Sequence, residues 1–73
     1  MKKRWKFHEV FRETINGSLT PERLIRIGGA TFGPGVTFSR GVSFGGVDIF
    51  QFYGHDIEAE EHGDVLVITG FYR

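Results

Sequence analysis

Residues 57–72, IEAEEHGDVLVITGFY, carry the clearest structural pattern in this chain. Ile57 and Ala59 alternate with acidic residues, and residues 65–69 are rich in β-branched side chains, which favour strands. Glycine and aspartate, both frequent in turns, lie between the two runs. The pattern predicts a β-hairpin with its loop near residues 61–64.

A second pattern lies upstream, where phenylalanine recurs at every sixth position over residues 32–50. Because six is an even number, an extended chain turns these rings to one face. The spacing fits a hexapeptide β-helix, a meander of very short strands joined by three-residue loops, or longer strands bent at glycines. Bulky rings fit poorly into every rung of a narrow coil, so the last two structures are favoured. Both predict a curved sheet with one side lined by Val36, Phe38, Val42 and Phe44.

Two shorter segments also have the pattern of strands. Residues 48–53, DIFQFY, predict a strand that ends at Gly54. Residues 23–27, RLIRI, also predict a strand. Thr20-Pro21-Glu22 can instead cap a helix of about two turns, which the following glycine pair would end.

The N-terminal part of the chain fits two structures. Residues 5–15, WKFHEVFRETI, alternate as a strand would, and Asn16-Gly17 after them fits a two-residue hairpin turn. The same residues also carry a helical stripe of apolar side chains, which the glycine could end. The sequence therefore leaves strand and helix open for residues 4–15.

Length and pattern together predict a single small domain over residues 1–73. The predicted fold is mainly β: a glycine-rich, curved antiparallel sheet or a partly open barrel of about five to six short strands, with room for one short N-terminal helix. An α+β fold is the alternative. No stretch reaches the ~20 apolar residues of a membrane helix, no secretory signal is present and cysteine is absent. We therefore expect a cytoplasmic protein that does not bind membranes.

The composition favours self-association. A chain of 73 residues has a marginal core, and without cysteine no disulfide can reinforce it. Eight phenylalanines are a large apolar load for so small a domain. The uncharged C-terminal run VLVITGFY is predicted to form an unpaired edge strand that contacts a second copy. The candidate interface residues are Val65, Val67, Phe71 and Tyr72.

The sequence contains no pattern that indicates a catalytic or cofactor site. It has no phosphate-binding glycine loop and no G-x-S-x-G nucleophile motif. Metal-type ligands cluster in residues 55–64, where exposed acids on a hairpin and histidines at turns account for them. They are His55, Asp56, Glu58, Glu60, Glu61, His62 and Asp64. The predicted function is a non-enzymatic interaction module without a cofactor, which acts as a homo-oligomer, most simply a dimer, or through another protein partner.

Charge is unevenly distributed along the chain, although the net charge is zero. Residues 1–40 hold eight Lys and Arg against three acids, whereas residues 41–73 hold one Arg against six acids. This asymmetry can steer association with a charged partner. Pairing of the two halves across a sheet within one fold also accounts for it, and is the favoured interpretation.

The basic N-terminal segment, residues 1–6, indicates an alternative function. It combines positive charge with a stacking ring, as in small β-barrels that bind single-stranded nucleic acid. The candidate contacts are Lys2, Lys3, Arg4, Trp5 and Lys6. The neutral total charge and the acidic second half argue against nucleic-acid binding. A solvated tail whose Trp5 packs on the core is the favoured interpretation of this segment.

Overall fold

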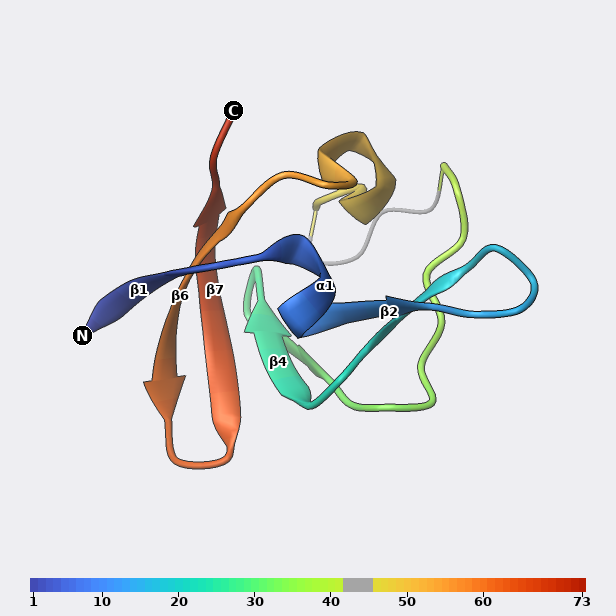
Figure 1. Cartoon of the computed structure of the whole chain (residues 1–73). Helices are drawn as coiled ribbons and strands as arrows, with labels where there is room; N and C mark the ends of the chain where they lie inside the picture. Colours follow the sequence, from blue (N-terminus) through green and yellow to red (C-terminus); the bar gives the residue numbers. More distant parts are fainter. Residues whose placement is uncertain (42–45) are drawn as a thin grey trace.

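The described part of the chain combines two β-sheets with two short helical turns (Figure 1). A computed structural model describes residues 1–41 and 46–73 of the chain. The strands are β1 (Lys2–Trp5), β2 (Phe11–Glu13), β3 (Leu19–Pro21), β4 (Leu24–Ile27), β5 (Ala30–Phe32), β6 (Ile57–His62) and β7 (Val65–Phe71). The helical turns are α1 (Phe7–Val10) and the 3₁₀ turn η1 (Ile49–Phe52). The predicted mainly β class is confirmed, and the larger sheet does not close into a barrel.

The larger sheet has the strand order β1-β6-β7-β4-β5, and β2 pairs with β3 in the smaller sheet. The paired strands run antiparallel except β4 and β7, which run parallel. A parallel pair needs a long connection between its strands. The prediction of an antiparallel sheet misses this one pairing, because turn signals report only on strands that follow each other directly in the sequence.

The predicted C-terminal hairpin is confirmed. β6 and β7 pair up to His62 and Val65, so Gly63 and Asp64 form the turn. Gly63 has a φ of 62°, a left-handed conformation that glycine adopts without steric cost. The predicted unpaired C-terminal edge is wrong, because β7 pairs with β6 on one side and with β4 on the other. The uncharged side chains of β7 suit this central position, whereas the edge strand β1 is basic.

Residues 4–15 form the end of a strand, one helical turn and a second strand. The turn is capped because the Glu9 carboxylate accepts a hydrogen bond from the Lys6 backbone N–H at 2.8 Å. Three apolar side chains at helical spacing are buried: Phe7, Val10 and Phe11. Ile15 is fully exposed, so strand alternation fails to predict its environment.

β2 and β3 form a second hairpin at the predicted site. Its loop has three residues instead of two, because the Thr14 N–H donates to the Ser18 carbonyl at 2.7 Å. Gly17 ends the loop with a φ of 79°. Thr20 and Pro21 belong to β3, so the predicted helix cap at these residues is wrong. The strand predicted after them is present as β4.

The phenylalanine repeat behaves only partly as predicted. A tight turn follows β5, in which the Val36 N–H donates to the Gly33 carbonyl at 3.2 Å. Phe38 is fully buried as expected. Val36 is 37% exposed and does not line the core, because it closes this surface turn. Val42 and Phe44 lie outside the described residues.

Residues 48–53 contain the 3₁₀ turn η1 (Ile49–Phe52), so the strand predicted there is wrong. The Asp48 carboxylate accepts a hydrogen bond from the Phe50 N–H at 3.1 Å and caps the turn. The rings of Phe50 in the turn and of Tyr53 directly after it lie parallel, with centroids 6.4 Å apart. An apolar run is compatible with either structure, and the cap together with the burial of Ile49 favours the helical turn.

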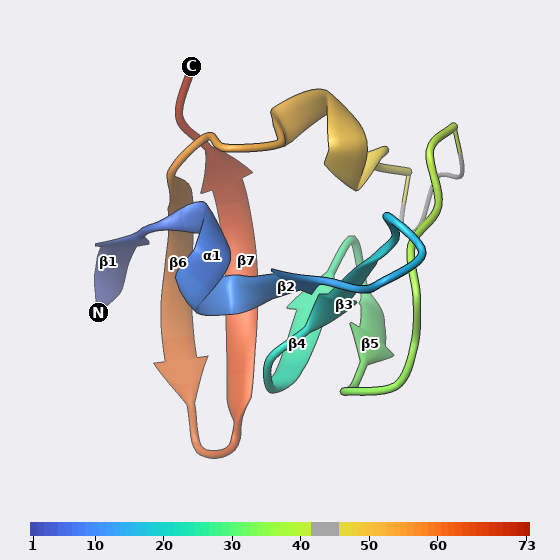
Figure 2. The ribbon, with the colours of Figure 1, turned by 45° about the vertical axis from the view of Figure 1, so that its right-hand side comes forward.

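The core lies between the larger sheet and a layer formed by α1 and the β2–β3 hairpin (Figure 2). Its buried apolar residues are Phe7, Val10, Phe11, Leu19, Ile25, Ile27, Phe38, Ile49, Ile57, Ala59, Leu66 and Ile68. Strand alternation directs Leu66 and Ile68 of β7 toward this layer. We call this side of the larger sheet its inner face, and the opposite side its outer face.

Candidate functional site

The outer face of the larger sheet carries two rows of side chains across β6, β7 and β4. The register places His62 and Leu24 on either side of Val65. It also places Glu60 and Arg26 on either side of Val67. We call these six residues the outer patch: Leu24, Arg26, Glu60, His62, Val65 and Val67. Their neighbours Ile25 and Leu66 point to the inner face and are fully buried.

The centre of the outer patch is apolar and accessible. Leu24 is 41% exposed, and Val65 and Val67 are half-buried. A hollow of about 290 Å³ is lined by Arg26, His62, Val65 and Val67. Within residues 1–41 and 46–73, the core-covering layer of α1 and β2–β3 lies on the other side of the sheet (Figures 1 and 2). The strip of apolar side chains therefore faces outward.

Charged groups flank this apolar centre with opposite signs. The Glu60 carboxylate is 2.9 Å from His62 Nε2 and 3.6 Å from the N-terminal amine. The N-terminal ammonium and, to a smaller extent, His62 hold the pKa of Glu60 below its ordinary value, so Glu60 is ionised at neutral pH. Arg26 lies on the other side of β7 and has no ion-pair partner among the described residues. From β6 across β7 to β4, the outer patch thus presents an acid, an apolar strip and a cation that has no ion-pair partner among the described residues.

The four residues predicted as an interface lie in two places. Val65 and Val67 belong to the outer patch. The Phe71 ring stacks on Phe52 with centroids 4.3 Å apart, so it is engaged within the chain. The Tyr72 ring lies under the guanidinium of Arg4, 4.2 Å from its centroid. The pairing of β6 with β7 shifts register between Glu58 and Ala59, so Phe71 pairs with the buried Ile57 instead of continuing the outer face of Val65 and Val67.

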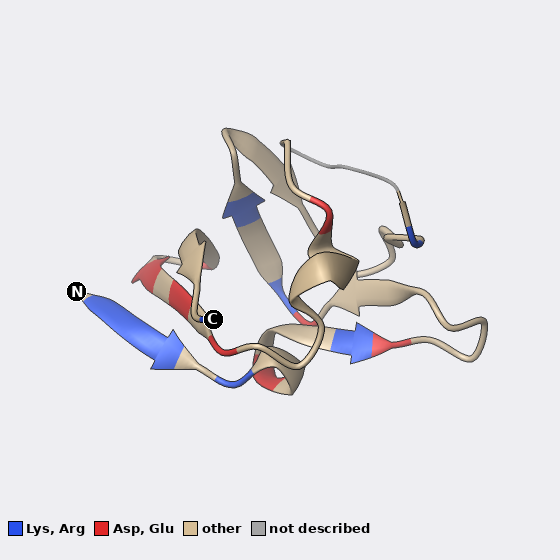
Figure 3. Ribbon diagram, turned by 90° about the horizontal axis from the view of Figure 1, so that it is seen from above, with Lys and Arg blue, Asp and Glu red and all other residues tan. Residues whose placement is uncertain are grey.

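The residues predicted to contact nucleic acid form β1 and the residue after it, and most of their charge is neutralised within the chain. Lys2 lies 3.9 Å from Glu58, and Lys6 lies 3.7 Å from Asp56. Arg4 also pairs with Asp56. Figure 3 shows the basic strand β1 directly beside the acidic residues of β6. The predicted pairing of the two oppositely charged halves across a sheet is therefore confirmed.

Two of these N-terminal residues turn toward the inner face instead. Lys3 pairs in register with Ala59, and its ammonium lies 4.8 Å from the centroid of the Trp5 ring. Trp5 is half-buried and packs against the core, as expected for a segment held down by its aromatic side chain. The ring of Trp5 is therefore a packing group, covered on one side by Lys3.

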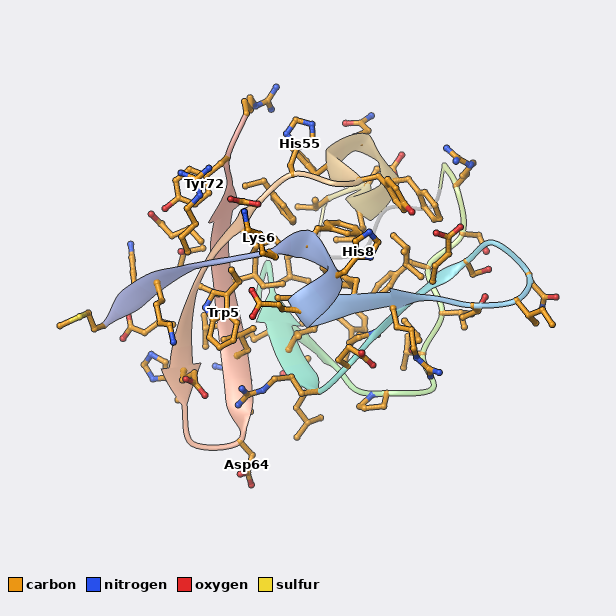
Figure 4. All side chains as sticks on the ribbon, viewed as in Figure 1. Trp5, Lys6, His8, His55, Asp64 and Tyr72 are labelled. Atoms are coloured by element: carbon orange, nitrogen blue, oxygen red, sulfur yellow. The ribbon has the colours of Figure 1, made fainter. Side chains whose placement is uncertain are left out.

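The histidines and acids of residues 55–64 do not converge on one point. Figure 4 shows His55 and Asp64 at opposite ends of the molecule, with Asp64 at the β6–β7 turn. A ring nitrogen of His55 lies 2.8 Å from the Tyr72 carbonyl. Among the described residues, no group of three or more His, Asp or Glu side chains could hold a metal ion.

Sequence reasoning missed the part of the outer patch that β4 contributes. Leu24 and Arg26 share one strand parity, so the strand predicted over RLIRI carries them on one face. Nothing in the sequence indicates that β4 lies beside β7, because the two strands pair in parallel across a long connection. In the sequence, Glu60 and His62 stand out only as residues of the types that bind metal ions.

Comparison of the chain with protein-family models, with curated protein sequences and with solved structures found no match. Among the described residues, no helix has both the length and the apolar character needed to cross a membrane. The arrangement of the outer patch is therefore the basis for a functional proposal.

Proposed function

We propose that this chain is a non-enzymatic interaction module that forms a homodimer through the outer patch. The observation that carries the proposal is the apolar strip of Leu24, Val65 and Val67 on a sheet face that the core-covering layer leaves open. Sheets with one apolar face are stabilised by burying that face against another layer. A second copy of the same chain can supply this layer, so no other protein is needed.

The sheet edges are less suited to self-association than the outer face. β1 is one edge of the larger sheet and bears Lys2, Lys3 and Arg4 in succession. Charged edges discourage pairing with another chain. β5, the opposite edge, has only three residues. Face-to-face packing of two sheets, as in a β-sandwich, is therefore the favoured mode of contact.

The alternative function, nucleic-acid binding through residues 1–6, has less support. Lys2, Arg4 and Lys6 already contact carboxylates of the same chain. A phosphate backbone would have to displace these internal partners, so the positive charge available for it is reduced. A cytoplasmic location likewise remains a prediction.

Light scattering and sedimentation over a wide range of concentration test the dimer. We expect a mass that rises from 8.3 kDa toward twice that value as the concentration increases. Val67→Glu places two like charges at the centre of the contact and should hold the protein at the monomer mass. Ile15→Glu is the matched control, because it makes the same type of change at a fully exposed residue of the β2–β3 loop. A wild-type mass of 8.3 kDa at every concentration would refute the proposal.

A further inference from the structure

We infer that the two-fold axis of the proposed dimer runs along β7, so that Arg26 of each copy contacts Glu60 of the other. This inference rests on the proposed homodimer and specifies its contacts. When two identical faces pack against each other, their two-fold axis lies in the plane of the interface. Packed sheets keep their strands aligned within about 30°, so the axis runs either along the strands or across them.

An axis along β7 matches the charges of the outer patch. It places β6 of one copy over β4 of the other, while β7 lies over its own counterpart. Glu60 then faces Arg26 of the second copy, and Val67 faces the same residue of that copy. Two Arg26–Glu60 pairs flank one continuous apolar strip, so Arg26 and Glu60 of each copy both face a charge of opposite sign.

An axis across the strands leaves Arg26 without an acidic partner. In that arrangement β6 lies over β6 and β4 lies over β4. If the axis passes at the level of Arg26, this residue faces Arg26 of the second copy. If the axis passes midway between the two rows of side chains, Arg26 faces Leu24 of the second copy. Covering a cation against a like charge or an apolar side chain is unfavourable. The charge pattern therefore selects the axis along β7.

The two charged groups also have the free bonding capacity that this contact requires. Arg26 has no ion-pair partner among the described residues, and its guanidinium carries five N–H donors. Both ionic contacts of Glu60, from His62 and from the N-terminal amine, fall on Oε1. The second carboxylate oxygen, Oε2, can accept from a guanidinium.

Charge reversal at these two positions tests the inference. Arg26→Glu and Glu60→Arg each create two like-charge contacts per dimer, and each should weaken dimerisation by about tenfold or more. The double variant Arg26→Glu/Glu60→Arg restores opposite charges within one chain and should dimerise nearly as well as the wild type. A mixture of the two single variants should form a heterodimer. Arg12→Glu, an equal charge change on β2, is the control and should leave the dissociation constant unchanged.

The outcomes separate the axis from the dimer itself. If Val67→Glu abolishes the dimer but the single charge reversals leave its dissociation constant unchanged, the dimer stands and the axis along β7 is wrong. If the double variant dimerises as poorly as the single variants, the Arg26–Glu60 contact is refuted. If the wild type is a monomer throughout, both proposals fail. Far-ultraviolet circular dichroism of each variant verifies that it is folded.

Discussion

The Arg4 Nε lies 2.6 Å from the Asp56 Oδ2, although 52 residues separate the two in the sequence. This contact joins the end of β1 to the residue that precedes β6. Lys6 approaches the same carboxylate at 3.7 Å. Asp56 thus receives two cations from the basic half of the chain, which makes it a focus of the internal charge neutralisation.

The stability of the fold should depend on the ionisation of Asp56. The Arg4 hydrogen bond, followed by the charge of Lys6, holds the pKa of Asp56 below its ordinary value of 3.8 in spite of partial desolvation. Since the folded-state pKa is lower than the unfolded one, this contribution to stability is present above about pH 4 and is lost as the pH falls through the folded-state pKa. Replacing Arg4 with Gln should therefore reduce the decline in melting temperature below about pH 4.

Thermal melts of the wild type and Arg4→Gln between neutral and acidic pH measure this effect. Arg12→Gln removes a cation from a more exposed ion pair with Glu22 and serves as the control. Parallel curves for the wild type and Arg4→Gln over the whole range would show that Asp56 does not contribute to the acid response.

Phe38→Ala should destabilise the fold severely. Phe38 is fully buried and its ring packs edge-on against Phe11 and Phe32. Truncating a buried phenylalanine costs about 3–5 kcal/mol, and small domains have a total stability of about 5–15 kcal/mol. Urea denaturation measures the loss. Val36→Ala is the control in the same repeat, and its cost should be below about 1 kcal/mol because Val36 lies in a surface turn and is 37% exposed. Equal stability of both variants would contradict the observed burial.

Phe71→Ala should lower stability without weakening the proposed dimer. The stacking of Phe71 on Phe52 lies within one chain, and Phe71 is not part of the outer patch. Loss of a partly buried aromatic contact costs about 1–2 kcal/mol. The dissociation constant, measured by sedimentation at a temperature where the variant is folded, should match the wild type. A dimer that dissociates on this change would move the interface to the C-terminal residues.

The chain should bind single-stranded oligonucleotides weakly. Internal ion pairs at Lys2, Arg4 and Lys6 leave little free positive charge on β1. Fluorescence anisotropy with a labelled oligonucleotide at two salt concentrations measures the affinity. Tight binding that falls steeply with added salt, and that is lost in Lys2→Glu/Lys3→Glu, would favour the nucleic-acid function instead.

Local patterns in the sequence determined the elements whose partners are close along the chain. The hairpin of β6 and β7 follows from the alternation before Gly63-Asp64 and the β-branched run after it, because a short turn makes the strands that flank it pair. Asn16-Gly17 likewise indicated the place of the loop between β2 and β3, although this loop has three residues instead of two. The charge asymmetry correctly indicated pairing of the two halves, because unlike charges on neighbouring strands attract.

Tertiary structure decided what the local patterns leave open. An apolar run such as residues 48–53 fits a strand or a 3₁₀ turn, and the Asp48 cap with the burial of Ile49 gave the turn. Alternation shows that Leu24 and Val65 each face one side of a strand, but it does not show that their strands are neighbours. Which strands become neighbours depends on the long-range pairing that buries the most apolar surface in the shared core. The outer patch exists because β4 and β7, brought together by their buried residues Ile25 and Leu66, carry their remaining apolar side chains to the same outer face.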